Sequence, residues 1–255
     1  KMVEVFRKVR RVLKDEGTVW LNLGDSYASN HYTGARDSDT GWKHGELSQG
    51  YQARAGGAGG VFKVKDLMGI PWMVAFALRA DGWYLRQDII WHKPNPMPES
   101  VTDRCTKAHE YIFLLSKQKK YYYDHEAIKQ PVKEDWGTRD RTDGKYHNEG
   151  TGLSPHTGLE DSYETANKRS VWTVTTKPFK GAHFAVFPPD LIEPCVLAGC
   201  PEDGTVLDPF GGAGTTGLVA DRNGRNAILI ELNDEYAEMA IDRLYNDAPL
   251  FVDIE

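Results

Sequence analysis

The strongest chemical signal in the sequence is a glycine-rich segment at positions 208–216. The nonapeptide DPFGGAGTT follows the β-prone run Gly204–Asp208 and opens a helical stretch, and Glu231 ends the next β-prone run fifteen residues later. Small residues let the backbone pass close to a ligand, and a carboxylate after the following strand can accept hydrogen bonds from two ribose hydroxyls. This spacing predicts an adenosine-binding site.

Two kinds of adenosine-containing cofactor are candidates for this site. Gly212, Gly214 and Gly217 satisfy the G-x-G-x-x-G dinucleotide fingerprint, so a nicotinamide-dependent oxidoreductase is one alternative. Asp208, however, places a carboxylate where a pyrophosphate would have to pass. A carboxylate there suits a cationic cofactor such as S-adenosylmethionine, whose sulfonium and ammonium outnumber its carboxylate. The residues therefore favour S-adenosylmethionine.

Hydrophobic periodicity indicates which elements position these residues. Five helices are predicted: Lys1–Leu13, Asp66–Ala80, Phe187–Ala198, Thr215–Asn223 and Asp234–Tyr245. Five strands are predicted: Thr18–Leu23, Trp83–Trp91, His109–Ser116, Gly204–Asp208 and Asn226–Glu231. From position 204 onward strands and helices alternate, which is typical of a parallel sheet covered by helices.

Composition and charge exclude several classes of protein. The 255 residues are 40% hydrophobic and 27% charged, and no apolar run approaches the length of a membrane span, so we expect a cytoplasmic protein without membrane contact. Cys105, Cys195 and Cys200 have no metal-ligand spacing, which predicts reduced core thiols and no metal site. The net charge is −6 but is uneven, because residues 101–133 hold seven Lys or Arg against four acids and residues 187–255 hold three against fourteen. Only the first of these regions suits contact with phosphates.

Five segments together resemble the S-adenosylmethionine-dependent DNA amino-methyltransferases, which modify cytosine N4 or adenine N6 in a duplex. They are residues 208–216 with Glu231, and residues 11–27, 90–98, 109–117 and 183–191. Because the cofactor motif comes last, the order is similar to the permuted class of this family. The resemblance implies an α/β fold, a doubly wound, mostly parallel sheet with an antiparallel edge hairpin (a Rossmann-like methyltransferase fold), plus a small irregular inserted recognition region.

The resemblance also implies a domain organisation and site residues. Residues 1–130 would form the catalytic half, 131–170 the inserted target-recognition region, and 171–255 the cofactor-binding half. The cofactor would contact Asp208, Phe210, Gly211, Gly212, Gly214, Thr215, Thr216, Glu231 and Phe184. Duplex DNA and the extruded base would contact Trp91, Lys93, Asn95, Asp25, Ser26, Arg139 and Arg141.

One family motif is absent from the sequence. The catalytic tetrapeptide, an Asp, Ser or Asn followed by Pro-Pro and an aromatic residue, does not occur, and Pro188–Pro189 has the wrong neighbours and is expected only to start a helix. We therefore expect no catalytic residue within residues 1–255, and we expect the tetrapeptide upstream of Lys1. The alternative is a catalytically inactive relative that binds DNA or the cofactor. A restriction endonuclease is a candidate partner, and the protein is expected to be a monomer or homodimer.

Overall fold

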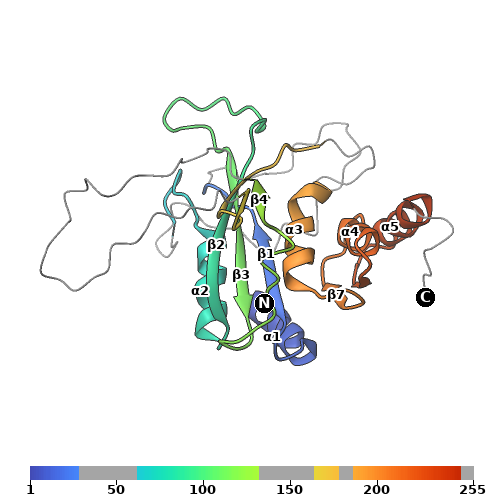
Figure 1. The fold of residues 1–255 in the computed structure, drawn as a ribbon. Coiled ribbons are helices and arrows are strands. Elements are labelled where there is room, and N and C mark those ends of the chain that lie inside the picture. Colours follow the sequence, from blue (N-terminus) through green and yellow to red (C-terminus); the bar gives the residue numbers. More distant parts are fainter. Residues whose placement is uncertain (29–61, 132–163, 178–185, 248–255) are drawn as a thin grey trace, which may run out of the picture.

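The core of the protein is a four-stranded mixed sheet (Figure 1). The computed structural model describes residues 1–28, 62–131, 164–177 and 186–247. The strand order is β1 (Thr18–Leu23), β3 (His109–Ser116), β2 (Tyr84–His92) and β6 (Val171–Thr173). β3 is antiparallel to both of its neighbours, whereas β2 and β6 are parallel.

Helices cover both faces of this sheet, as the side chains of β3 show. Phe113 and Leu115 pack with α1 (Met2–Val12) and α2 (Ile70–Ala80). Ile112 points to the other face and packs with α3 (Pro189–Gly199). Because alternate residues of a strand point to opposite faces, a strand buried on both sides must be apolar throughout. The continuous apolar run of β3 follows from this position.

A second unit is built from β7 (Thr205–Asp208), α4 (Thr215–Arg222), β8 (Asn226–Leu229) and α5 (Asp234–Asp247). β7 and β8 are parallel, and α4 packs against both strands and against α3 and α5. Figure 1 shows this unit beside the four-stranded sheet, with α3 between the two. Since α3 also contacts β1, it connects this second unit to the four-stranded sheet.

The predicted helices and strands are confirmed with small shifts at their ends. The largest shift is in α2, which begins at Ile70 rather than Asp66, because its N-cap Gly69 has a left-handed backbone (φ +68°) that a helix cannot contain. The Ile70 N–H donates to the Asp25 Oδ1 at 3.0 Å. Pro188 and Pro189 start α3, as expected. The predicted antiparallel pair is present as β2 and β3, but β3 lies between β1 and β2 rather than at the edge of the sheet.

The two short strands on either side of residues 132–163 lie next to each other in space. Gln130 and Pro131 form β4, which pairs antiparallel with β5, Thr165 and Ala166. Residues 132–163 lie outside the described residues, so the boundaries 131–170 stay a prediction.

Two smaller expectations have different outcomes. Cys195 and Cys200 are buried and free, and burial raises the pKa of the Cys195 thiol. Cys105 is also free but exposed, so the expectation of a core position is wrong for this residue. Within the described parts of the chain, none of the helices has the length and apolar character needed to cross a membrane.

Candidate functional site

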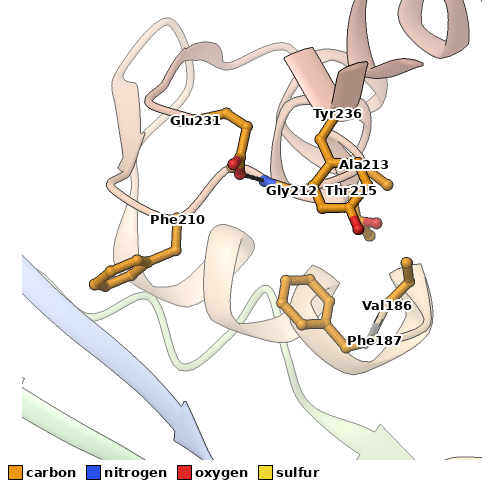
Figure 2. A pocket seen from close by; sticks show the side chains of 9 residues that line it. Val186, Phe187, Phe210, Gly212, Ala213, Thr215, Glu231 and Tyr236 are labelled. Carbon is orange, nitrogen blue, oxygen red and sulfur yellow. Dashed lines mark hydrogen bonds between the residues drawn. The ribbon is translucent and has the colours of Figure 1, made fainter. Parts of the chain in front are cut away.

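The glycine-rich segment forms one wall of an open pocket of about 290 Å³. Figure 2 shows the Glu231 carboxylate above the loop that carries Gly212, with the ring of Phe187 on the opposite side. The pocket is lined by Val186, Phe187, Phe210, Gly211, Gly212, Ala213, Thr215, Glu231 and Tyr236. The volume is close to the lower end of the usual range for small-molecule sites. The loops after β7 and β8 thus meet around one cavity, as the sequence predicted.

Glu231 connects these two loops. Its Oε2 accepts a hydrogen bond from the Gly212 N–H at 2.8 Å, and its Oε1 accepts from the N–H groups of Leu232 and Asn233, both at 2.9 Å. Several backbone donors on one carboxylate stabilise its charged form. Glu231 therefore holds the glycine-rich loop in place and also presents its carboxylate to the pocket.

Asp208 organises the same loop through its hydrogen bonds and is not among the residues that line the pocket. Its Oδ1 accepts from the Phe210 N–H at 2.9 Å, and its Oδ2 accepts from the Thr216 hydroxyl at 2.5 Å. An aspartate that bonds the backbone two residues ahead forms a local turn. Asp208 thus ties the end of β7 to the first turn of α4 and leaves Phe210 projecting at the pocket, 54% exposed.

The glycines are explained by backbone shape and by close packing. Gly212 and Gly214 have φ values of +52° and +72°, a region that residues with a side chain rarely adopt. A Cβ on Gly214 would lie 2.8 Å from the Cβ of Ala240 in α5. The close approach of α5 therefore depends on Gly214, while Gly211 and Gly212 line the pocket.

One face of α5 completes the pocket wall, although no residue of this helix was among the predicted cofactor contacts. Tyr236 lines the pocket, Ala240 faces Gly214, and Arg243 Nη1 donates to the Ala213 carbonyl at 2.9 Å and to the Thr215 hydroxyl oxygen at 2.8 Å. These residues are four and three positions apart, which places them on the same face of a helix. This spacing is visible in the sequence and could have been used to predict which face of α5 meets the glycine-rich loop. Burial lowers the pKa of Arg243.

Among the residues expected to contact DNA, those that the structure describes lie where β1 and β2 end. Lys93 forms an ion pair with Glu110, and its Nζ lies 4.2 Å from the centre of the Trp91 ring. Glu110 also accepts a hydrogen bond from the Asn22 Nδ2 at 3.2 Å. Trp91 is only 4% exposed, and its indole N–H donates to the Val174 carbonyl at 2.8 Å. Trp91 is therefore a buried residue whose ring lies next to the Lys93 ammonium, and its predicted contact with an extruded base stays a prediction.

The other expected substrate contacts hold backbone segments together. The side chain of Asn95 donates to the Thr176 carbonyl and accepts from the Thr176 N–H, both at 3.0 Å. Asp25 caps α2 at Ile70 and accepts from the Ser26 N–H at 2.9 Å. The side chains of Asn95 and Asp25 can each form further hydrogen bonds, which leaves them able to contact a substrate as well.

Three predicted contacts cannot be placed in this arrangement. Phe184, Arg139 and Arg141 lie outside the described residues. Glu110 was missed as a site residue because its partners, Asn22 and Lys93, are distant in the sequence. The expectation of a catalytic tetrapeptide upstream of Lys1 stays a prediction.

The comparisons with known proteins agree on the family. The DNA methylase family model for N6 and N4 methyltransferases matches residues 1–242. The Type II methyltransferase M.SmaI of Serratia marcescens is 49% identical over 243 residues, which cover 95% of this chain and 72% of that protein. The Type II methyltransferase M.Cfr9I of Citrobacter freundii is 44% identical over 247 residues, covering 97% and 71%.

Solved structures confirm the expected Rossmann-like α/β class of fold. The cytosine-N4-specific PvuII DNA methyltransferase matches with a TM-score of 0.60 and 18% identity, covering 94% of this chain and 70% of that one. The structure of M1.HpyAVI with S-adenosylmethionine matches with a TM-score of 0.56 and 18% identity, covering 96% and 83%. The family match over nearly the whole chain, together with this fold and the loop geometry, shows that the chain belongs to the N6/N4 DNA methylase family.

Proposed function

We propose that the protein transfers a methyl group from S-adenosylmethionine to the exocyclic amino group of a cytosine (N4) or an adenine (N6) in duplex DNA. The observation that carries this proposal is the pocket formed by the loops after β7 and β8, in a chain whose residues 1–242 match a DNA methylase family. The nicotinamide-dependent alternative has no support from the comparisons.

The residues of the pocket fit the proposed cofactor. Glu231 would accept hydrogen bonds from the ribose hydroxyls, and Phe187 and Phe210 would supply apolar surface for the adenine and the methionine chain. Asp208 would act through its charge, since its oxygens already accept from Phe210 and Thr216. When bound, the cofactor supplies an electrophilic methyl group on a sulfonium.

The amino nitrogen of a paired base lies inside the helical stack, so this chain must accept a flipped base. Flipping costs a few kcal/mol, which contacts to the extruded nucleotide and the DNA backbone must offset. Glu110 and the ring of Trp91 fix the direction of the Lys93 side chain. Because an ammonium group has three N–H donors, Lys93 would still have donors for a phosphate or a base edge. Asn95, Asp25 and Ser26 would contribute polar contacts beside it.

Sequence recognition is proposed for residues 131–170, with Arg139 and Arg141 as contacts to phosphates or bases. The relatives M.SmaI and M.Cfr9I are named Type II methyltransferases, which supports a role in DNA modification and a restriction endonuclease as a partner.

The test is methyl transfer from labelled S-adenosylmethionine to a duplex containing all short sequence contexts. The methylated DNA is digested to nucleosides, which are separated and identified by mass, so that N4-methylcytosine and N6-methyladenine are distinguished. Label in either nucleoside supports the proposal. Saturable cofactor binding with no transfer from the full-length protein would instead support the inactive-relative alternative.

A further inference from the structure

A second pocket lies at the end of the sheet opposite Lys93 and Asn95. At this end β1 and β2 begin and β3 ends, whereas the candidate DNA contacts follow the other ends of β1 and β2. The pocket has a volume of about 400 Å³. We call it the basic pocket; its lining residues are Arg7, Arg10 and Arg11 of α1, Asp81 after α2 and Lys117 after β3.

The single acidic side chain among the lining residues is already paired. The Nε of Arg7 lies 2.8 and 3.0 Å from the two carboxylate oxygens of Asp81. Lys117 Nζ donates to the Leu13 carbonyl at 2.9 Å and lies 2.9 Å from the exposed Asp15 carboxylate. These contacts hold Arg7 and Lys117 in place at the wall of the basic pocket.

Arg10 and Arg11 form no ion pair with any residue in the described parts of the chain. The guanidinium of Arg10 lies 6.0 Å from the centre of the Trp83 ring and has one long contact, 3.4 Å, with the Gly82 carbonyl. Its Nε is buried without a hydrogen-bond partner among the described residues. The contacts of Arg10 within the described residues are therefore long ones, and its Nε donor is left unused at the pocket.

This grouping of charge favours an anionic ligand. Like charges three and four positions apart on a helix repel each other, as Arg7, Arg10 and Arg11 must. A concave surface lined by charges of one sign concentrates the field and attracts ions of the opposite sign. Guanidinium groups match the planar pairs of oxygen atoms that phosphate presents.

We infer that the basic pocket binds a phosphate group. The phosphate belongs either to duplex DNA, at a point away from the target base, or to a small phosphorylated molecule. Both sources share the same chemistry, namely a compact anion that accepts hydrogen bonds from Arg10 and Arg11 and offsets the charge of these two arginines, which form no ion pair within the described residues.

Inorganic pyrophosphate is the probe for the basic pocket, and its binding to the full chain is measured by calorimetry at low salt. Arg11→Gln removes an exposed pocket cation, and Lys8→Gln is the matched control because Lys8 is an exposed cation of the same helix outside the pocket. The affinity for pyrophosphate should fall about tenfold in the first variant and less than about twofold in the control. Absence of saturable binding to the unaltered protein, or equal losses in both variants, would overturn the inference.

Asp81→Asn gives a result that partial unfolding does not imitate. It removes the one lining carboxylate and frees Arg7, so the affinity for pyrophosphate should rise. A lowered affinity in a variant with an unchanged melting temperature would contradict the inference.

The salt dependence of DNA binding distinguishes the two sources of phosphate. If DNA occupies the basic pocket, Arg11→Gln should reduce the slope of log affinity against log salt by about 0.9 relative to Lys8→Gln. If that slope is unchanged while pyrophosphate binding is lost, the ligand is a small phosphorylated molecule.

Discussion

Replacing Glu231 by glutamine tests whether one carboxylate both braces the glycine-rich loop and binds the cofactor. The variant keeps the size of the side chain and removes its charge. Its amide oxygen can accept from the N–H groups of Leu232 and Asn233, but the amide NH₂ then faces the N–H of Gly212. Two donors facing each other cannot form the hydrogen bond that now measures 2.8 Å.

The two roles predict two separable effects. Loss of the brace acts on the protein without ligand, so the free energy of unfolding should fall by about 1–3 kcal/mol, the cost of leaving a partly buried donor without its partner. Loss of the ribose contact acts only on the bound state. A hydrogen bond to a charged group contributes about 1.5–3 kcal/mol, so the affinity for S-adenosylhomocysteine should fall by about tenfold or more.

Thermal or denaturant unfolding without ligand measures the first effect, and calorimetric titration with S-adenosylhomocysteine measures the second. Glu235→Gln is the control, because it makes the same change in charge at an exposed position four residues away that does not line the pocket. An affinity within about twofold of the unaltered protein would refute the ribose contact. Unchanged stability would refute the brace.

Three further predictions concern the same half of the protein and the inserted region. Asp208→Asn can keep both hydrogen bonds of the side chain, with the amide donating to the Thr216 hydroxyl oxygen. The cofactor affinity measured by calorimetry should therefore fall while the melting temperature stays unchanged. Asp208→Ala should lower both the affinity and the melting temperature. Gly214→Ala should destabilise the protein by about 2–4 kcal/mol in denaturant unfolding, because the added Cβ meets Ala240 and the backbone has a positive φ. Replacing residues 132–163 by a short Gly/Ser linker, which the pairing of β4 with β5 allows, should preserve cofactor binding and abolish sequence-selective DNA binding; selectivity that survives would place recognition elsewhere.

Local patterns predicted most helices and strands because each depends on residues close in the sequence. The strand His109–Ser116 was predicted with its observed bounds, yet its place between β1 and β2 was not. Strand order depends on contacts between distant segments, and a buried strand has the same apolar pattern with parallel or antiparallel neighbours. The start of α2 was missed because a glycine can adopt a helical or a left-handed backbone, and the sequence does not show which of the two Gly69 adopts.

The candidate site was predicted in composition but not in the role of each side chain. The glycine-rich segment and Glu231 surround one pocket, as their spacing indicated. Trp91 and Asn95 were predicted to contact an extruded base, and the structure shows in addition that they hydrogen-bond the backbone at Val174 and Thr176, which the sequence did not indicate. A sequence motif shows which residues occur together, and it does not distinguish a side chain that contacts the ligand from one that positions its neighbour.

The acidic residues of the C-terminal part illustrate the same limit of a sequence pattern. Residues 187–255 hold fourteen acids, but two of their carboxylates, Asp208 and Glu231, accept hydrogen bonds from groups of the glycine-rich segment. Neutral donors such as a backbone N–H or a hydroxyl stabilise a carboxylate without removing its charge. Both oxygens of Asp208 fix the turn after β7, and the side chain does not line the pocket. Asp208→Asn therefore separates the charge of this side chain from its structural role more cleanly than Asp208→Ala, because the amide can keep both hydrogen bonds and the methyl group can keep neither.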